Sequence, residues 1–179
     1  MTTNIPHWQK VHTIVFDFDG IFTNNRVYVD ENGKETVVCS RADGLAFDIL
    51  RRFIQMNRWN LELFILSKET NPVVMSRANK MNIDCIQSID NKASYIITYL
   101  KKNLKNSTGL IYVGNDLNDL EVMLLPGVFS VAPSDSHPRI LSIADCVLPY
   151  QGGESFVRFF IEALLRLDCM ENEALASVL

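Results

Sequence analysis

Two aspartates, Asp17 and Asp19, stand one residue apart in the stretch VFDFDGIFT, after an apolar run and before a glycine. If the run is a strand, its alternation places both carboxylates on one side, with Phe16 and Phe18 on the other. Carboxylates this close repel each other unless a cation lies between them or one is protonated. Magnesium, which binds through one or two carboxylates and phosphate oxygens, is the expected cation. A solvated turn is the alternative interpretation.

A second acidic cluster occurs in GLIYVGNDLNDLEVM, residues 109–123. An apolar run is again followed by a glycine and then by polar residues that open a helix: Asn115, Asp116, Asn118 and Asp119. The carboxyl ends of parallel strands meet at one edge of a sheet, so the two clusters together would form one divalent-cation site. Capping of the helix by Asn118 or Asp119 is the simpler interpretation, and both can hold.

Two further residues extend this pattern. Ser67 follows the apolar run at 61–66, where its hydroxyl could donate to a phosphate oxygen beside a helix N-terminus. Lys92 begins another predicted helix. Taken singly, a serine here is a cap or turn residue and the lysine is solvated. Their order along the chain, together with the acidic clusters, favours a phosphate site.

The elements that must position these residues alternate along the chain. Short segments rich in β-branched or aromatic residues predict strands at 12–16, 61–66, 84–87, 109–113, 128–131 and 145–148. Helical patterns cover 43–58, 72–81, 91–104, 117–125, 136–142 and 154–168. The alternation predicts an α/β fold, a three-layer doubly wound parallel sheet with helices on both faces. Residues 26–39 predict an inserted β-hairpin at the same sheet edge, either a flap or subunit contact or a decorative edge.

Composition limits the classes of function. The 179 residues suit one domain, 1–179, and their net charge of -4 without a basic stripe argues against nucleic-acid binding. No signal peptide and no apolar run of the ~20 residues that span a bilayer are visible, so no membrane partner is expected. Four dispersed cysteines without a CxxC pair indicate reduced thiols in a cytoplasmic protein. The three histidines are not spaced as zinc ligands.

DFDGIFT, Ser67, Lys92 and GNDLND resemble the four motifs of the haloacid dehalogenase-like phosphatases, and the resemblance spans nearly the whole chain. It implies a Rossmann-like fold, and the short connections leave no room for a large cap domain. It also implies that Asp17 attacks phosphorus to form an aspartyl-phosphate and that Asp19 is the general acid and base. Lys92 and Mg²⁺ would offset the charge repulsion, and Ser67 would orient a phosphoryl oxygen. The implied metal ligands are Asp17, Asp19, Asn115, Asp116 and Asp119.

The hairpin, the run 41–44 and the C-terminal QGGESFVRFF resemble the subfamily that acts on phosphates of 3-deoxy-ulosonic sugar acids. This likeness implies a small phosphorylated sugar acid as substrate and a role in surface-polysaccharide (lipopolysaccharide) precursor synthesis. It also implies a homotetramer whose hairpins form a central barrel, with a neighbouring subunit closing each site. The implied substrate-binding residues are Thr23, Arg41, Asp43, Gly44, Glu69, Arg77, Lys80 and Arg158. A C-terminal tail follows at 169–179.

Residues 66–84 narrow the choice of substrate. Where the octulosonate enzymes typically carry threonine-glycine-arginine, this chain has Ser67-Lys68-Glu69, and Arg77 and Lys80 follow on the predicted helix. A glutamate and a lysine at these places resemble the nine-carbon, sialic-acid-type phosphatases. Glu69 could accept hydrogen bonds from sugar hydroxyls, and either cation would favour a carboxylate. A nine-carbon 9-phosphate is therefore the favoured substrate, with 3-deoxy-manno-octulosonate 8-phosphate as the alternative. The simpler interpretation is an exposed helix start.

Two positions depart from the subfamily pattern. Asn115 stands where an acid is usual, so this position would supply no charge to a metal, and Ser155 stands where glycine is usual. A second class of function is therefore kept, a catalytically silent oligomerisation module like the C-terminal domain of animal sialate cytidylyltransferases. The chain retains Asp17, Asp19, Ser67 and Lys92, none of which a scaffold needs, and this favours the enzyme.

Overall fold

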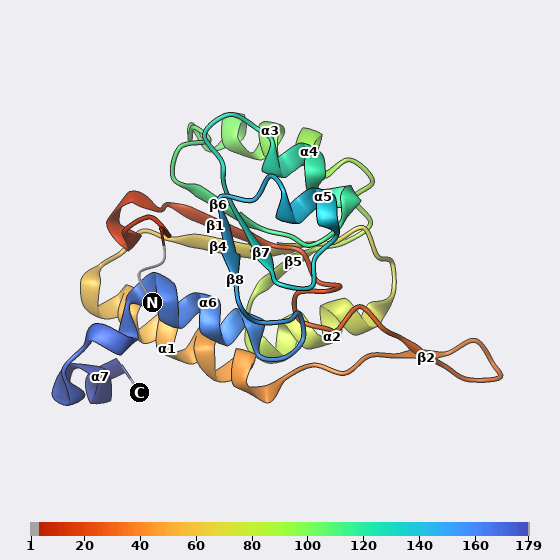
Figure 1. Ribbon diagram of the computed structural model, residues 1–179, viewed down its shortest axis with the longest axis horizontal. Coiled ribbons are helices and arrows are strands. Elements are labelled where there is room, and N and C mark those ends of the chain that lie inside the picture. The colour runs from red at the N-terminus through yellow and green to blue at the C-terminus, as the bar shows by residue number, and fades with distance from the viewer. Residues whose placement is uncertain (1–3, 179) are drawn as a thin grey trace.

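The computed structural model describes residues 4–178. In this part of the chain six parallel strands form one sheet in the order β5-β4-β1-β6-β7-β8 (Figure 1). The strands are β1 (Thr13–Phe16), β4 (Glu62–Leu66), β5 (Asp84–Ile86), β6 (Leu110–Val113), β7 (Phe129–Pro133) and β8 (Cys146–Leu148). The chain runs outward from β1 to one edge and then returns to the other side of β1. The carboxyl ends of β1, β4 and β6 therefore surround a topological switch point, where α/β sheets bind ligands.

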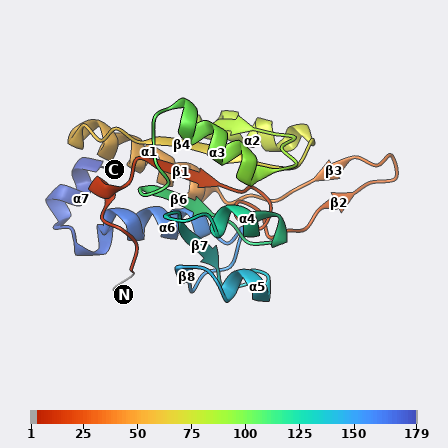
Figure 2. The same ribbon diagram turned by 90° about the horizontal axis from the view of Figure 1, so that it is seen from above.

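Helices cover both faces of the sheet (Figures 1 and 2). One face carries α1 (Arg41–Asn57), α2 (Pro72–Met81), α6 (Phe156–Leu165) and α7 (Asn172–Val178). The other carries α3 (Lys92–Lys102), α4 (Leu120–Met123) and α5 (Pro138–Leu141). The predicted doubly wound α/β fold is confirmed. None of the helices between residues 4 and 178 combines the length and hydropathy that crossing a membrane would require.

The centre of the sheet explains the apolar strands. Every residue of β1 and β6 is buried, because helices pack on both faces of these strands. On the face of α1 and α6, the ring of Phe16 packs against Phe22, Phe47 and Phe160 at centroid distances of 5.7, 5.8 and 5.7 Å. This aromatic packing directly underlies the DFDGIFT loop and fixes where that loop leaves the sheet.

The inserted hairpin is present, although its strands are short. β2 (Tyr28–Val29) pairs antiparallel with β3 (Glu35–Thr36), and the arm extends away from the main sheet (Figures 1 and 2). Its turn is closed by the Asp30 carboxylate, which accepts hydrogen bonds from the amides of Asn32 and Lys34. The alternation at 26–39 predicted longer strands than the two residues on each side that pair here.

Two predicted helices are interrupted. The segment predicted at 117–125 is a 3-10 turn, Leu117–Asp119, followed by α4. The segment predicted at 154–168 ends at Leu165, because Arg166 adopts a left-handed conformation with φ 55° before a second 3-10 turn, Leu167–Cys169. The tail from 169 contains α7, whose Val178 is buried against the core.

Candidate active site

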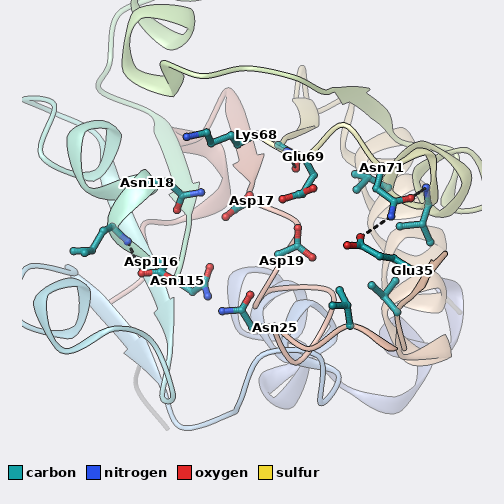
Figure 3. Close-up of a pocket in the computed structure, with 16 residues that line it drawn as sticks. Asp17, Asp19, Asn25, Glu35, Lys68, Glu69, Asn71, Asn115, Asp116 and Asn118 are labelled. Carbon is teal, nitrogen blue, oxygen red and sulfur yellow. Dashed lines mark hydrogen bonds between the residues drawn. The ribbon is translucent and has the colours of Figure 1, made fainter. Parts of the chain in front are cut away.

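Several of the predicted site residues gather at one cavity of about 480 Å³ at the carboxyl ends of the strands (Figure 3). Asp17 and Asp19 come from the loop after β1, Ser67 from the end of β4, and Asn115 from the loop after β6. The walls are completed by Asn25, Val27, Glu35, Val37, Lys68, Glu69, Asn71, Val73, Val74, Asp116, Leu117 and Asn118. Segments from four parts of the chain thus form one concave site.

A buried ion-pair cluster lies at the inner end of the cavity. The Lys92 ammonium, at the first position of α3, is 2.8 Å from Asp17 Oδ1 and 2.7 Å from Asp119 Oδ1. Asp17 Oδ1 also accepts the Phe18 amide at 2.7 Å. The three charged residues are at most 4 % exposed. One cation between two carboxylates leaves a net negative charge in a desolvated place, so a further cation at this site would be favoured.

The hydrogen bonds of Asp119 do not fit its predicted role as a direct metal ligand. Its Oδ1 accepts from Lys92 Nζ and, at 2.7 Å, from the Tyr112 hydroxyl. Its Oδ2 accepts from the amides of Asn115 and Asp116 at 2.9 and 3.3 Å. Asp119 is fully buried and does not line the cavity. The carboxylate therefore anchors Lys92 and the loop after β6 instead of facing a ligand.

Burial and neighbouring charges alter the proton affinities in this cluster. Burial raises the pKa of Asp17, and repulsion from Asp119 raises it further, against the opposing effect of Lys92. Burial lowers the pKa of Lys92, but attraction to the two carboxylates outweighs this effect and the net pKa is raised. Lys92 is thus held in its charged form.

Asp19 has a different environment. It is partly exposed, and its side chain faces the cavity (Figure 3). Burial raises its pKa, and repulsion from Glu69 raises it further. A carboxyl group with a raised pKa that faces a cavity is suited to proton transfer. Thr23, predicted to bind substrate, is instead fully buried, and its hydroxyl accepts the Gly20 amide at 3.2 Å and donates to Asp19 at 3.5 Å.

Asn115 is the best-placed additional metal ligand. Its Oδ1 is buried and has no hydrogen-bond partner, and the side chain packs so closely on Gly20 that an added Cβ would lie 1.8 Å from Nδ2. Asp116 lines the cavity, but its Oδ1 accepts the Leu117 amide as a helix cap. Among the described residues no group of three Asp, Glu, His or Cys side chains could hold a metal. Asp17 with the Asn115 amide oxygen still fits Mg²⁺, which needs few protein ligands when it also binds phosphate and water.

Ser67 and Glu69 lie where the sequence predicted, on the cavity wall. Ser67 is 1 % exposed, and its hydroxyl oxygen accepts the Glu69 amide at 3.1 Å, which closes the turn after β4. That hydrogen bond leaves the hydroxyl proton available to a ligand oxygen. Glu69 points its carboxylate toward Asp19 (Figure 3).

Most of the predicted substrate-binding residues lie elsewhere. None of Arg41, Asp43, Gly44, Arg77, Lys80 and Arg158 lines the cavity. Several form a cluster at the base of the hairpin instead. Asp43 is fully buried and accepts the backbone amide of Arg158 at 3.0 Å, and Arg77 donates to the carbonyl oxygen of Ser40 at 2.6 Å. The sequence could not separate these residues from those that line the cavity, because it does not state the direction in which a side chain points.

The backbone conformation shows why glycine is usual at the position of Ser155. Ser155 adopts the left-handed conformation, φ 63°, which glycine would take without strain. Its hydroxyl forms a 2.8 Å hydrogen bond with that of Ser40, the N-cap residue of α1. The preceding Gly152 touches the DFDGIFT loop so closely that an added Cβ would lie 1.9 Å from the carbonyl oxygen of Gly20. The C-terminal loop thus supports the loop that carries both aspartates.

Sequence reasoning overlooked three residues of this region, Tyr112, Glu35 and Asn71. Tyr112 could have been noticed, because a tyrosine within a buried strand needs a partner for its hydroxyl. Glu35 and Asn71 gave no comparable signal. They meet only because the projecting hairpin passes beside the start of α2.

Comparison with known proteins places this arrangement in a family. No protein-family model matches the chain. A structure assigned to the HAD family of hydrolases, from Streptomyces avermitilis, is 33 % identical, with a TM-score of 0.83 and coverage of 94 % of each chain. The chain belongs to the HAD family of hydrolases.

Within that family the chain is similar to enzymes named 3-deoxy-D-manno-octulosonate 8-phosphate phosphatase. The enzyme of that name from Salmonella typhi is 28 % identical over 167 residues, which cover 93 % of this chain and 85 % of the relative. The Moraxella catarrhalis enzyme, solved with magnesium, phosphate and KDO, shares the fold at a TM-score of 0.79 and 24 % identity, with 89 % and 88 % coverage. The predicted family is confirmed, and the relatives' names agree with the predicted class, a phosphoric monoester hydrolase.

Proposed function

We propose that this protein is a magnesium-dependent phosphatase that hydrolyses the phosphate monoester of a 3-deoxy-2-keto sugar acid. The observation that carries the proposal is the pairing of a buried, Lys92-bound Asp17 with a partly exposed Asp19 at the same cavity. The two carboxyl groups have different surroundings and so can have different roles. The proposal treats the chain as one phosphatase domain with the hairpin at 26–39 as an insertion.

In the proposed reaction, a carboxylate oxygen of Asp17 attacks phosphorus and the bond from phosphorus to the ester oxygen breaks. Its electron pair stays on the leaving oxygen, which takes a proton from Asp19. Asp19 then removes a proton from water, the water oxygen attacks the aspartyl-phosphate, and phosphate leaves with Asp17 restored. Ser67 donates to a phosphoryl oxygen, and Lys92 reduces the repulsion between Asp17 and the phosphate.

Magnesium fits beside Asp17 and Asn115, whose Oδ1 lacks a partner, and when bound it supplies positive charge to the phosphoryl oxygens. Asp116 and the Asp19 carboxylate remain candidates for its outer contacts. Removal of the metal with a chelator should therefore abolish phosphate release, and added Mg²⁺ should restore it.

The names of the relatives support the eight-carbon substrate, 3-deoxy-manno-octulosonate 8-phosphate. The nine-carbon preference stays a prediction whose support is Glu69, since Arg77 and Lys80 do not line the cavity. A rate panel of eight- and nine-carbon ulosonate phosphates separates them. A preference of kcat/KM for the eight-carbon compound would remove the nine-carbon assignment.

A homotetramer is part of the proposal. Tyr28, Val29 and Val38 of the hairpin are 68, 61 and 59 % exposed, which is unusual for apolar side chains that gather on one arm. Light scattering gives the mass in solution, and a monomer would contradict this part of the proposal.

The decisive experiment is phosphate release by the wild type and by Asp17→Asn with Mg²⁺ present. We expect a fall of at least ~10³-fold, because loss of an enzymatic nucleophile has effects of this size or larger. A silent oligomerisation module would release no phosphate in either form. Unchanged activity in Asp17→Asn would remove Asp17 from the role of nucleophile.

A further inference from the structure

The outer wall of the cavity is formed by the hairpin. Val27, Glu35 and Val37 face Asn71 and Val73, at the start of α2, across the opening. The polar residue among the three hairpin residues is Glu35, on β3. Its carboxylate points toward the cavity, in the direction of Asp19 (Figure 3). A charged side chain between two apolar residues of this wall suggests a contact with a ligand.

Glu35 is held in place although it is exposed. Its Oε2 accepts a hydrogen bond from Asn71 Nδ2 at 2.8 Å. Asn71 is itself fixed, because its Oδ1 caps α2 through the Val73 amide at 3.0 Å and its carbonyl oxygen accepts from Gln87 at 2.9 Å. One end of the Asn71 amide thus belongs to the helix, and the other end orients Glu35.

The carboxylates of Asp19, Glu35 and Glu69 surround the outer part of the cavity, next to the proposed phosphate position. Asp19, Glu35 and Glu69 all line the cavity, and the carboxylates of Glu35 and Glu69 point toward Asp19 (Figure 3). Ionised carboxylates only accept hydrogen bonds. This part of the cavity therefore suits a ligand segment rich in hydroxyl donors and disfavours an anionic one. Lys68 is the one lysine or arginine among the residues that line the cavity in the described chain.

We propose that Glu35, oriented by Asn71, is a specificity-determining residue that accepts a hydrogen bond from a hydroxyl group of the substrate's carbon chain near the phosphate ester. It faces Glu69 across the cavity, so that the hydroxylated segment lies between two acceptors. The substrate's own carboxylate then lies outside this space. The inference rests on the proposed function and names the residue by which a sugar phosphate would be distinguished from other phosphate esters.

The test compares two substrates in each variant. One is an ulosonate phosphate, and the other is p-nitrophenyl phosphate, whose leaving group has no hydroxyl donors. In Glu35→Ala we expect kcat/KM for the sugar acid to fall about 10- to 100-fold, the usual effect of losing a hydrogen bond to a charged group. The value for p-nitrophenyl phosphate should stay within about twofold, since the inner end of the cavity is untouched.

Two further variants make the experiment specific. Glu31→Ala removes an exposed glutamate of the same hairpin that does not line the cavity, and it should leave both substrates unaffected. Asn71→Asp keeps a capping oxygen for α2 but replaces the donor with a repelling carboxylate. It should lower kcat/KM for the sugar acid selectively, by less than Glu35→Ala.

The outcomes separate the inference from the proposed function. A wild type that hydrolyses neither compound overturns both. An active wild type whose preference for the sugar acid survives in Glu35→Ala overturns only the role of Glu35. An equal fall in kcat/KM for both substrates also overturns the role of Glu35, because it indicates a general disturbance of the site.

Discussion

The two ends of the cavity are built on different principles. At the inner end, Asp17, Lys92 and Asp119 are almost fully buried and joined by bonds of 2.7–2.8 Å. At the outer end, Glu35 is exposed, Asn71 is half-buried, and a single hydrogen bond joins them. Buried charges remain in place only when partners satisfy them, so the inner end is preorganised and intolerant of change. The outer end depends on where the hairpin lies and should tolerate substitution, with effects on selectivity.

The largest effect is expected from Lys92→Met. This change leaves Asp17 and Asp119 buried without their cation, which should lower the free energy of unfolding by about 3–5 kcal/mol and abolish phosphate release. Chemical denaturation and a phosphate assay measure both effects. Lys68→Met is the matched control, because Lys68 lines the outer cavity and is exposed. Equal losses of stability in the two variants would contradict the contrast between the ends.

Asp43, at the base of the hairpin, gives a pH-dependent prediction. Burial raises its pKa from 3.8 to about 6, against the opposing effects of the Arg158 amide and Arg77. The folded state therefore holds this proton more tightly than the unfolded chain. The wild type should lose stability as pH rises from about 4 to about 6, by up to about 3 kcal/mol, with no further change from this group above that range.

Asp43→Asn lacks this titration. Its free energy of unfolding, relative to that of the wild type, should rise between about pH 4 and about pH 6 and then stay level. Denaturation curves across this range provide the measurement, with Asp48→Asn, an exposed aspartate of α1, as control. A difference that is flat with pH would show that folding does not raise the pKa of Asp43.

Tyr112→Phe tests the anchor behind the inner end. It removes one of the donors to Asp119, a hydrogen bond to a buried charge, and should lower the free energy of unfolding by about 1.5–3 kcal/mol. It should also lower kcat more than KM changes, since Asp119 positions Lys92. Tyr99→Phe, which removes a hydroxyl that donates to the more exposed Glu62, should have a smaller effect and leave kcat unchanged.

The smallest effect is expected at Ser155. Ser155→Ala keeps the left-handed backbone but loses the hydrogen bond to Ser40, and should be destabilised by about 1 kcal/mol. Ser155→Gly loses the same bond but relieves a backbone cost of about 1 kcal/mol or more, so thermal denaturation should place it closer to the wild type. A glycine variant less stable than the alanine variant would exclude backbone strain at this position.

The sequence by itself determined the sheet and which polar side chains lie at its edge. Alternating apolar segments predicted the parallel strands, because strands covered on both faces must be apolar throughout. The positions of Asp17, Asp19, Ser67 and Asn115 after those strands then required them to meet at one edge. The type of a residue and its position after a strand are local properties, which can be read directly from the sequence.

Only the tertiary structure decided the direction in which each side chain points. Asp119, Arg77 and Asp43 carry charged groups of the kind that bind ligands, yet packing turns them toward Lys92, Ser40 and α6. Glu35 meets Asn71 across 36 residues of chain because the hairpin passes beside the start of α2. Such contacts depend on the balance of burial, charge and hydrogen bonding among distant segments, and no local pattern in the sequence expresses that balance.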